Sequence, residues 1–528
     1  MVFLRLAAAG LMVASAWAQE PPAPTFRAST RLVQVDVVVK SKDAPVGGLT
    51  KDDFQVSDNG KLQQIAVFSV REVNVTPPVA VPLPAGVVTN RPQYRGVEPV
   101  SATVVLIDAQ NTQPEDQGYA RLQALKYLDR ASRRELVAVY ALDTTLKVLQ
   151  GFTEDRAALR ASIDKYKMTQ SLNMQDGTPG SPGLLTGLTG NGANAMRAMN
   201  FQRQADITSA AFESIARHLS GLPGRKKFIW ITAAPPLTFT QENERNGATM
   251  REFTNLSPQL FAPLRLMNDA NVAIYPLDPR GVLPYHTPGL NDPGLPTMIQ
   301  LAEMTGGKAF YNDNDLASEI EAAIADTDLT YTLGFYPTEE GVDGSLHSIS
   351  VKVNRSGADA RYRRSYTAET VTKPLTEKFR KATLSAWVNQ PLDSTEIPLQ
   401  AAAVPTINKP GYYDVEVGID PSSLKLEQKD GSFVGSFEVA IVPDVENSPK
   451  GLHQTIKVNL TQERLLKALQ TGIVVINQIR VINNKGKLLA NQLHLVVMDQ
   501  ATGKTGSVRI PLCGAGSQPA NRFITGSC

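Results

Sequence analysis

Residues 101–108 read SATVVLID, and this stretch decides the expected fold. Residues 103–108 form an apolar run that ends in an acid, as in a strand buried on both faces of a parallel sheet. Helical spacing follows at 115–130, and a second apolar run, LVAVYAL, occupies 136–142. Because strands and helices keep alternating after that, we expect an α/β domain with a doubly wound, mostly parallel, Rossmann-like sheet.

The alternation continues to residue 336. We expect helices at 155–166, 202–220, 257–269, 297–304 and 315–326, and strands at 228–232, 272–277, 308–311 and 330–336. Residues 169–200 are rich in Gly, Asn, Thr and Met, which indicates a long surface excursion. The α/β domain is therefore expected to span 99–370.

Two β modules are expected to flank this domain. Residues 26–72 contain the alternating strand LVQVDVVVK and a hairpin turn at Asp58-Asn59-Gly60, which together predict a small β module. Residues 73–98 are proline-rich and predict a linker, and 371–396 predict a helical connector. Seven short strand-like runs between 397 and 528 predict a C-terminal β-sandwich.

The first eighteen residues have the pattern of a signal peptide. Arg5 supplies the positive charge, residues 6–14 are apolar, and Ala16-Trp17-Ala18 forms a small-x-small cleavage site. The alternatives are an N-terminal anchor and an apolar start without function. No later stretch is long and apolar enough to span a bilayer. We therefore expect an exported protein, periplasmic or extracellular, with no membrane span after cleavage.

The two cysteines, Cys513 and Cys528, lie near the C-terminus. In an oxidising compartment they are expected to form a disulfide that ties the tail to the last strand. The alternative is a pair of free thiols. No histidine or other base lies beside them, so neither cysteine is expected to be catalytic.

The charge and the motifs narrow the class of protein. The chain has 53 basic and 51 acidic residues and a net charge of +2. It therefore lacks the large excess of positive charge that is typical of nucleic-acid-binding proteins. It contains neither a G-x-S-x-G elbow nor an H-E-x-x-H zinc motif, and we expect a protein that is not an enzyme. Arg225-Lys226-Lys227 is a basic cluster before a buried strand, interpreted as solvated in preference to an anion site.

Several segments resemble one known family. They are Asp108-Ala109-Gln110-Asn111-Thr112, GLPGRKKFIWI at 221–231, ANVAIYPLDPRG at 270–281, LAEMTGGKAFYNDNDL at 301–316 and TYTLGFYP at 330–337. In this order they resemble the von Willebrand factor A-related family abundant in acidobacterial genomes. The resemblance implies a von Willebrand A-like domain in an extracytoplasmic protein with a role in adhesion or assembly.

The resemblance also implies a place for a metal ion. In this family an acid and two hydroxyls at alternate positions hold Mg²⁺, which prefers hard oxygen ligands. Here Asp108 keeps the acid and Thr112 a hydroxyl, while Gln110 replaces the middle serine. Thr208 is a candidate for a further hydroxyl ligand. The acid expected after FIWIT is missing, because Ala233-Ala234 stands there.

Two interpretations of Asp108 stay open. It is either a structural acid that hydrogen-bonds the loop, which we favour, or part of an altered site for Mg²⁺ or Mn²⁺. No cofactor is certain. In both cases Asp108, Gln110, Asn111 and Thr112 are the residues expected to contact a protein partner.

Three functions follow, and the leading one is an exported binding or scaffold protein for protein–protein interaction or adhesion. The second is a structural protein of envelope assembly. The third is a hydrolase with carboxylates at the carboxyl edge of the sheet, for which Asp108, Asp143 and Asp278 are the candidates.

Overall fold

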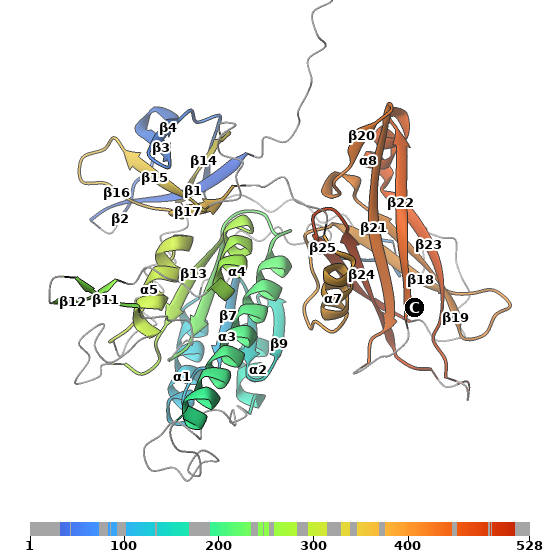
Figure 1. Cartoon of the computed structure of the whole chain (residues 1–528), viewed down its shortest axis with the longest axis horizontal. Coiled ribbons are helices and arrows are strands. Elements are labelled where there is room, and N and C mark those ends of the chain that lie inside the picture. The colour runs from blue at the N-terminus through green and yellow to red at the C-terminus, as the bar shows by residue number, and fades with distance from the viewer. Residues whose placement is uncertain are drawn as a thin grey trace, which may run out of the picture.

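The structure is a computed structural model of the whole chain. It describes residues 32–42, 44–72, 83–84, 86–91, 102–131, 135–167, 191–233, 241–245, 248–252, 258–281, 294–313, 329–337, 346–368, 375–445, 451–483, 486 and 488–512. These residues form an N-terminal β module, an α/β domain and a C-terminal β-sandwich (Figure 1).

The N-terminal β module is built from two distant parts of the chain. Its strands are β1 (Val33–Ser41), β2 (Ala44–Pro45), β3 (Phe54–Asp58), β4 (Lys61–Gln63), β5 (Val67–Glu72), β14 (Leu329–Phe335), β15 (Leu346–Val353), β16 (Asp359–Arg361) and β17 (Ser365–Thr367). The 3₁₀ helix η1 (Lys51–Asp53) precedes β3. β14 lies between β1 and β5, and β15 pairs with β3, all antiparallel. The predicted hairpin turn is confirmed, with Asn59 and Gly60 at positive φ.

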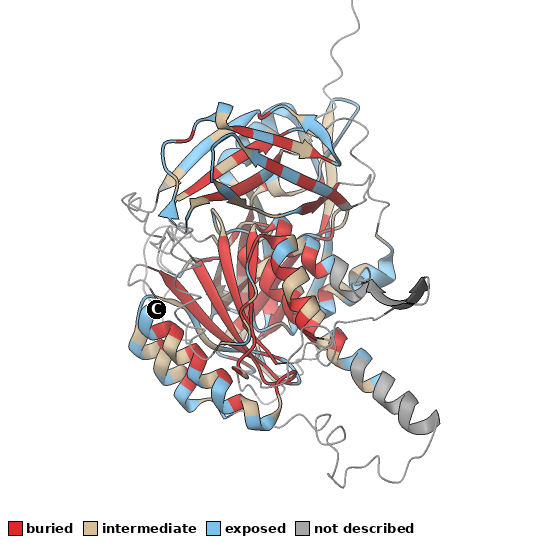
Figure 2. Cartoon of the chain, turned by 90° about the vertical axis from the view of Figure 1, so that its left-hand side faces the viewer, coloured by how far each residue is buried: buried red, intermediate tan, exposed pale blue. Residues whose placement is uncertain are grey.

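The α/β domain is centred on one five-stranded sheet. Its strands are β7 (Ala102–Asp108), β8 (Leu136–Leu142), β9 (Leu146–Thr153), β10 (Lys226–Ile231) and β13 (Val272–Leu277), in the order β13-β10-β7-β8-β9. The first four strands in that order are parallel, and β9 is antiparallel to β8. Nearly every residue of the parallel strands is buried (Figure 2). This agrees with their continuous apolar sequences.

Helices cover both faces of this sheet. They are α1 (Pro114–Arg130), α2 (Arg156–Lys165), α3 (Asn191–Leu219), α4 (Pro258–Asp269) and α5 (Gly294–Thr305). Buried side chains of α3 and α4 pack on one face and those of α1 and α2 on the other. A separate two-stranded sheet holds β11 (Gln241–Arg245) and β12 (Ala248–Glu252).

The C-terminal β-sandwich has two antiparallel sheets around one core. Its strands are β6 (Val88–Thr89), β18 (Leu399–Pro405), β19 (Tyr412–Ile419), β20 (Glu427–Lys429), β21 (Ser432–Pro443), β22 (Leu452–Thr461), β23 (Ile473–Arg480), β24 (Gln492–Asp499) and β25 (Thr505–Pro511). Three helical elements accompany them, namely α7 (Glu377–Val388), η6 (Pro421–Ser423) and α8 (Gln462–Thr471). β6 comes from the predicted proline-rich linker and pairs with β18, so part of that linker belongs to the sandwich.

The prediction of a doubly wound, mostly parallel fold was wrong. In the described part of the chain, parallel ladders occur only among β13, β10, β7 and β8, and the other sheets are antiparallel. The strand predicted at 330–336 does not extend the parallel sheet, because β14 pairs antiparallel with β1 and β5. Residues 308–311 contribute a single bridge, Leu277 to Phe310. The apolar sequence of a strand does not specify which other strand it pairs with. The tertiary fold determined the pairing of these strands.

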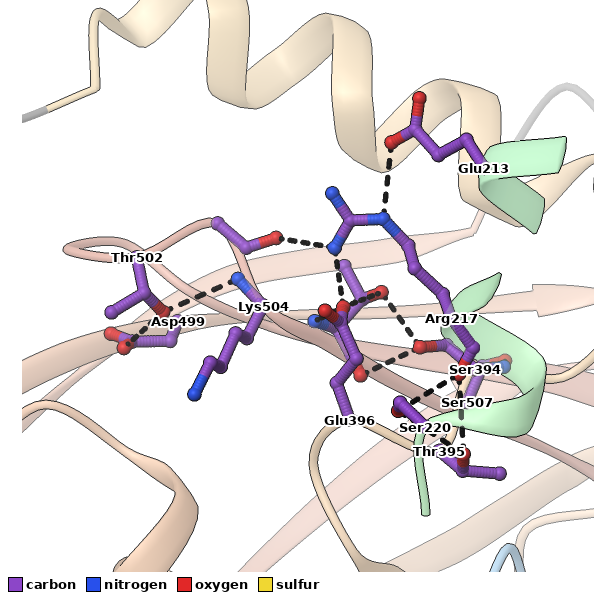
Figure 3. A network of polar contacts seen from close by, with 12 residues as sticks. Glu213, Arg217, Ser220, Ser394, Thr395, Glu396, Asp499, Thr502, Lys504 and Ser507 are labelled. Carbon is purple, nitrogen blue, oxygen red and sulfur yellow. Dashed lines mark hydrogen bonds and ion pairs between the residues drawn. The ribbon is translucent and has the colours of Figure 1, made fainter. Parts of the chain in front are cut away.

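Polar contacts join the α/β domain to the sandwich. Arg217, near the end of α3, pairs with Glu396 and with Glu213, the latter at 3.0 Å (Figure 3). The Thr395 hydroxyl accepts the backbone N–H of Gly221 at 2.7 Å. A Cβ on Gly221 would come within 2.8 Å of Thr395, so this approach requires glycine. These contacts fix the sandwich against the end of α3.

Candidate functional site

The candidate site lies where the order of the parallel strands reverses. From β7 the chain proceeds to β8 on one side and later to β10 on the other. In open parallel sheets the carboxyl ends of strands at such a reversal form the usual ligand crevice. Asp108 ends β7 there, and Thr232 and Ala233 follow β10. The structure therefore places Asp108 where the sequence predicted.

The Asp108 carboxylate is held by three N–H donors. Its Oδ1 accepts the backbone N–H of Asn111 at 3.0 Å. Its Oδ2 accepts Asn111 Nδ2 at 2.8 Å and the indole Nε1 of Trp230 at 2.9 Å. Asn111 Nδ2 also donates to the Thr208 hydroxyl at 3.0 Å. The structure thus brings Asp108, Asn111 and Thr208 together, with Thr208 well inside α3.

The cluster is closed to solvent in this structure. Asp108, Gln110 and Thr112 are each 0 % exposed, and Asn111 is 1 % exposed. Burial raises the pKa of Asp108 to about 6, although hydrogen bonds from Asn111 and Trp230 oppose the rise. Contact of these residues with a partner stays a prediction, and it requires them to become accessible.

Several polar atoms beside Asp108 have no hydrogen-bond partner. They are Gln110 Nε2 and Oε1, Asn111 Oδ1 and Thr112 Oγ1. Buried polar atoms are usually paired, so each of these is an exception that costs stability or awaits a ligand or water. All of them belong to neutral groups. Asp108 contributes the one negative charge of this set.

These residues do not fit a divalent cation. The carboxylate oxygens of Asp108 already accept three N–H bonds, so a cation would have to share them with these donors. Ala233, which follows β10, brings no oxygen ligand in its side chain. Among the described residues, no group of three or more His, Cys, Asp or Glu is placed to hold a metal ion. One buried carboxylate with neutral oxygens is a poor match for the hard, charged ligand sets of Mg²⁺ and Mn²⁺.

The other two candidate acids each have a cationic partner. Asp143, 2 % exposed, pairs with Lys147 at 2.6 Å. Asp278, 5 % exposed, makes a bidentate pair with Arg280, with its shortest contact at 2.6 Å. Asp108 instead bonds to neutral donors. No two of the three carboxylates are hydrogen-bonded to each other in the described structure.

Trp230 belongs to the site but was not predicted from the sequence. It lies in the strand predicted at 228–232, for which no hydrogen-bonding side chain was predicted. A buried tryptophan nearly always needs an acceptor for its indole N–H, and this requirement could have linked it to an acid at a neighbouring strand end. Ala234, Cys513, Cys528 and the predicted signal peptide at 1–18 lie outside the described residues.

In the described part of the chain, no helix combines the length and apolar character needed to cross a membrane.

No protein-family model matches the chain, and no curated protein matches it. Solved structures similar to it include an aerotolerance-related membrane protein from Bacteroides fragilis, at 12% identity and a TM-score of 0.25, covering 43% of this chain and 98% of that one. A von Willebrand factor type A protein from Catenulispora acidiphila has 9% identity and a TM-score of 0.24, with 85% and 74% covered. Three N-terminal domains of the pili tip protein Mfa5 from Porphyromonas gingivalis have 10% identity and a TM-score of 0.22, with 85% and 77% covered. At such scores, the description of the fold rests on the strand pairing above.

Proposed function

We propose that the chain is an exported, non-enzymatic binding or scaffold protein whose α/β domain takes part in protein–protein interaction or adhesion. The observation that supports this most is the state of Asp108. Its carboxylate is buried and occupied by Asn111 and Trp230, so it acts as a structural acid that shapes the β7–α1 loop. Asp143 and Asp278 are bound to Lys147 and Arg280. A hydrolase would need a carboxylate free to exchange a proton with substrate.

Gln110 and Thr112 are the residues best suited to test a role in binding. Their side-chain polar atoms have no internal partner, so the fold does not need these groups for hydrogen bonding. Replacing both with alanine should leave the Asp108 bonds intact while removing the unpaired polar atoms. Because both side chains are 0 % exposed, the variant must first be shown to unfold at the wild-type temperature, and a loss of partner binding then reports recognition.

The experiment is a crosslinked pull-down of the full chain from envelope extracts, quantified by mass spectrometry. We expect a specific partner that is recovered with the wild type and reduced at least fivefold with Gln110→Ala/Thr112→Ala. Gln150→Ala, on the edge strand β9, is the matched control and should behave as wild type. Recovery of no specific partner would count against a binding role. Undiminished recovery of the partner with the double variant would show that the partner does not bind through Gln110 and Thr112.

Metal dependence is tested separately, by thermal unfolding with Mg²⁺, Mn²⁺ or Ca²⁺. We expect no saturable rise in melting temperature, because the Asp108 oxygens are occupied by N–H donors. A saturable rise that disappears in Asp108→Ala would overturn this and favour metal-dependent adhesion.

Export is tested by fractionation of the producing cell and sequencing of the N-terminus. Cleavage after Ala18 predicts a mature chain beginning at Gln19 in the periplasm or medium. A chain that keeps Met1 in the cell interior would contradict the proposal.

A further inference from the structure

The basic cluster before β10 is not a solvated start of a strand, as the sequence suggested. Lys226 and Lys227 are each 3 % exposed. Lys227 Nζ pairs with Glu135 at 3.2 Å, whereas Lys226 Nζ donates to the backbone oxygen of Leu222 at 2.8 Å. Burial of cations is costly unless each one meets an acceptor or an opposite charge. The amino end of the sheet is therefore a place where positive charge has been taken out of water.

Arg225 lies at the seam between the α/β domain and the N-terminal β module. Its Nη2 donates to the Gly306 oxygen at 2.6 Å, and its Nη1 donates to the backbone oxygen of Asp36 at 3.3 Å. A Cβ on Gly306 would come within 2.7 Å of the backbone of Tyr362, so the two units are closely packed here. Both Arg225 partners are neutral carbonyls, and Arg225 Nε is buried without a partner.

Tyr275 of β13 faces the same region. Its side chain is 0 % exposed, and its hydroxyl lies beside the Arg225 guanidinium, with no acceptor for its O–H among the described residues. The Arg361 guanidinium lies 6.0 Å from the centre of the Tyr275 ring. Burial raises the pKa of Tyr275, but the positive charges of Arg361, Arg225 and Lys227 outweigh this effect, and the pKa falls below its ordinary value. A buried hydroxyl thus sits in a strongly positive field.

We propose that Arg225, Tyr275 and Arg361 bind a small inorganic anion, such as chloride, at the seam between the α/β domain and the N-terminal β module. The Tyr275 hydroxyl and Arg225 Nε each offer an N–H or O–H donor without a partner, and an anion accepts both. Its charge would offset that of Arg225, whose two acceptors named above are both carbonyl oxygens. Arg225 and Tyr275 come from the α/β domain and Arg361 from β16, so the bound anion would tie the two units together.

The test is thermal unfolding of the full chain at constant ionic strength, with sodium chloride replacing sodium gluconate. Gluconate is too large for a closed seam. We expect a saturable rise of about 2 °C at ten times the dissociation constant in the wild type. The rise should be lost in Tyr275→Phe and Arg225→Gln. Arg160→Gln, on the exposed face of α2, is the matched control and should respond as wild type. A sulfate series shows whether the seam also accepts a larger oxyanion.

Three outcomes would overturn the proposal. One is the absence of any saturable response in the wild type to either anion. Another is an equal response in Tyr275→Phe, since salts also stabilise proteins without a site. The third is the absence of excess ³⁵Cl line broadening with the wild type, a measurement that does not depend on the variants folding. Loss of the broadening in a folded Tyr275→Phe would support the site directly.

Discussion

At the carboxyl end of the parallel sheet, the buried carboxylate of Asp108 accepts three N–H bonds from Asn111 and Trp230. At the amino end, the buried or half-buried cations Arg225 and Lys226 have carbonyl oxygens as their partners. At the first end the hydrogen bonds to the buried charge come from neutral donors, and at the second end Lys227 has an acidic partner, Glu135, whereas Arg225 and Lys226 donate to carbonyl oxygens. A buried charge is compatible with stability when partners satisfy it, and otherwise burial shifts the pKa of the group toward its neutral form, as it does for Lys226.

The largest effect expected from this comparison is that of Asp108→Ala. It leaves three buried N–H groups without an acceptor, and we expect the free energy of unfolding to fall by about 4 kcal/mol. Asp155→Ala is the matched control, because Asp155 is exposed and accepts two backbone N–H groups at the start of α2. That change should cost about 1 kcal/mol. Urea unfolding measures both changes in the free energy of unfolding. Equal losses would show that the buried Asp108 contributes no more to stability than the exposed Asp155.

The two ends should also respond to pH in opposite directions. Burial raises the folded-state pKa of Asp108 to about 6, above its unfolded value of 3.8, so protonation favours the folded state. Relative to Asp108→Asn, the wild type should gain about 3 kcal/mol as pH falls from about 7 to about 4. Burial lowers the pKa of Lys226 from 10.5 to about 7, so the unfolded state binds the proton more tightly. Relative to Lys226→Met, the wild type should therefore gain stability as pH rises from about 7 to about 10.

Denaturant unfolding across pH checks both slopes. Slopes of the same sign for the two pairs of proteins would contradict the assignment of a buried acid to one end and a buried base to the other. A flat difference for Asp108→Asn would mean that the carboxyl titrates as it does in the unfolded chain.

Trp230→Phe should have an intermediate effect. It removes one donor from Asp108 Oδ2 and keeps most of the packing against Phe212, whose ring centre lies 4.9 Å away. We expect a loss of about 1.5 kcal/mol at pH 7, which shrinks at pH 5 as Asp108 becomes protonated. Because the variant lacks Trp230, its tryptophan fluorescence is not comparable with that of the wild type. Unfolding is therefore followed by far-ultraviolet circular dichroism. A loss independent of pH would assign the effect to packing alone.

Thr112→Val should have the smallest effect. Its hydroxyl is buried without a partner, so a methyl group of the same shape should change stability by less than about 0.5 kcal/mol or increase it. Thr208→Val removes one of the two acceptors of Asn111 Nδ2 and should cost about 1 kcal/mol. A Thr112→Val loss as large as that of Thr208→Val would reveal a bound water or ligand on Thr112.

The sequence predicted individual elements better than their partners. The runs LVAVYAL and VAIYPL form β8 and β13 at the predicted residues, because a continuous apolar run suits a strand covered on both faces. The strand at 330–336 was also found, yet its pairing with β1 and β5 was not, since nothing in TYTLGF specifies a partner some 260 to 300 residues earlier. β9 was missed because its residues are mostly half-buried or exposed at the edge of the sheet.

The candidate site was predicted in the same uneven way. The position of Asp108 followed from the end of an apolar strand, and its neighbour Thr208 was named from the family pattern. Trp230 as a hydrogen-bond donor could not be inferred, because contact between β7 and β10 depends on the order of strands in the sheet. The seam of Arg225, Tyr275 and Arg361 joins three separate segments, and no local pattern connects them.

The pairing of β1 with β14 has a consequence for synthesis of the chain. Val33 can pair with Phe335 only after about 300 further residues have been synthesised. At a synthesis rate of roughly 5–20 residues per second, this takes tens of seconds. During that time the apolar face of β1 lacks its native partner. The N-terminal strands are therefore among the first described elements to be synthesised and among the last to meet all of their partner strands.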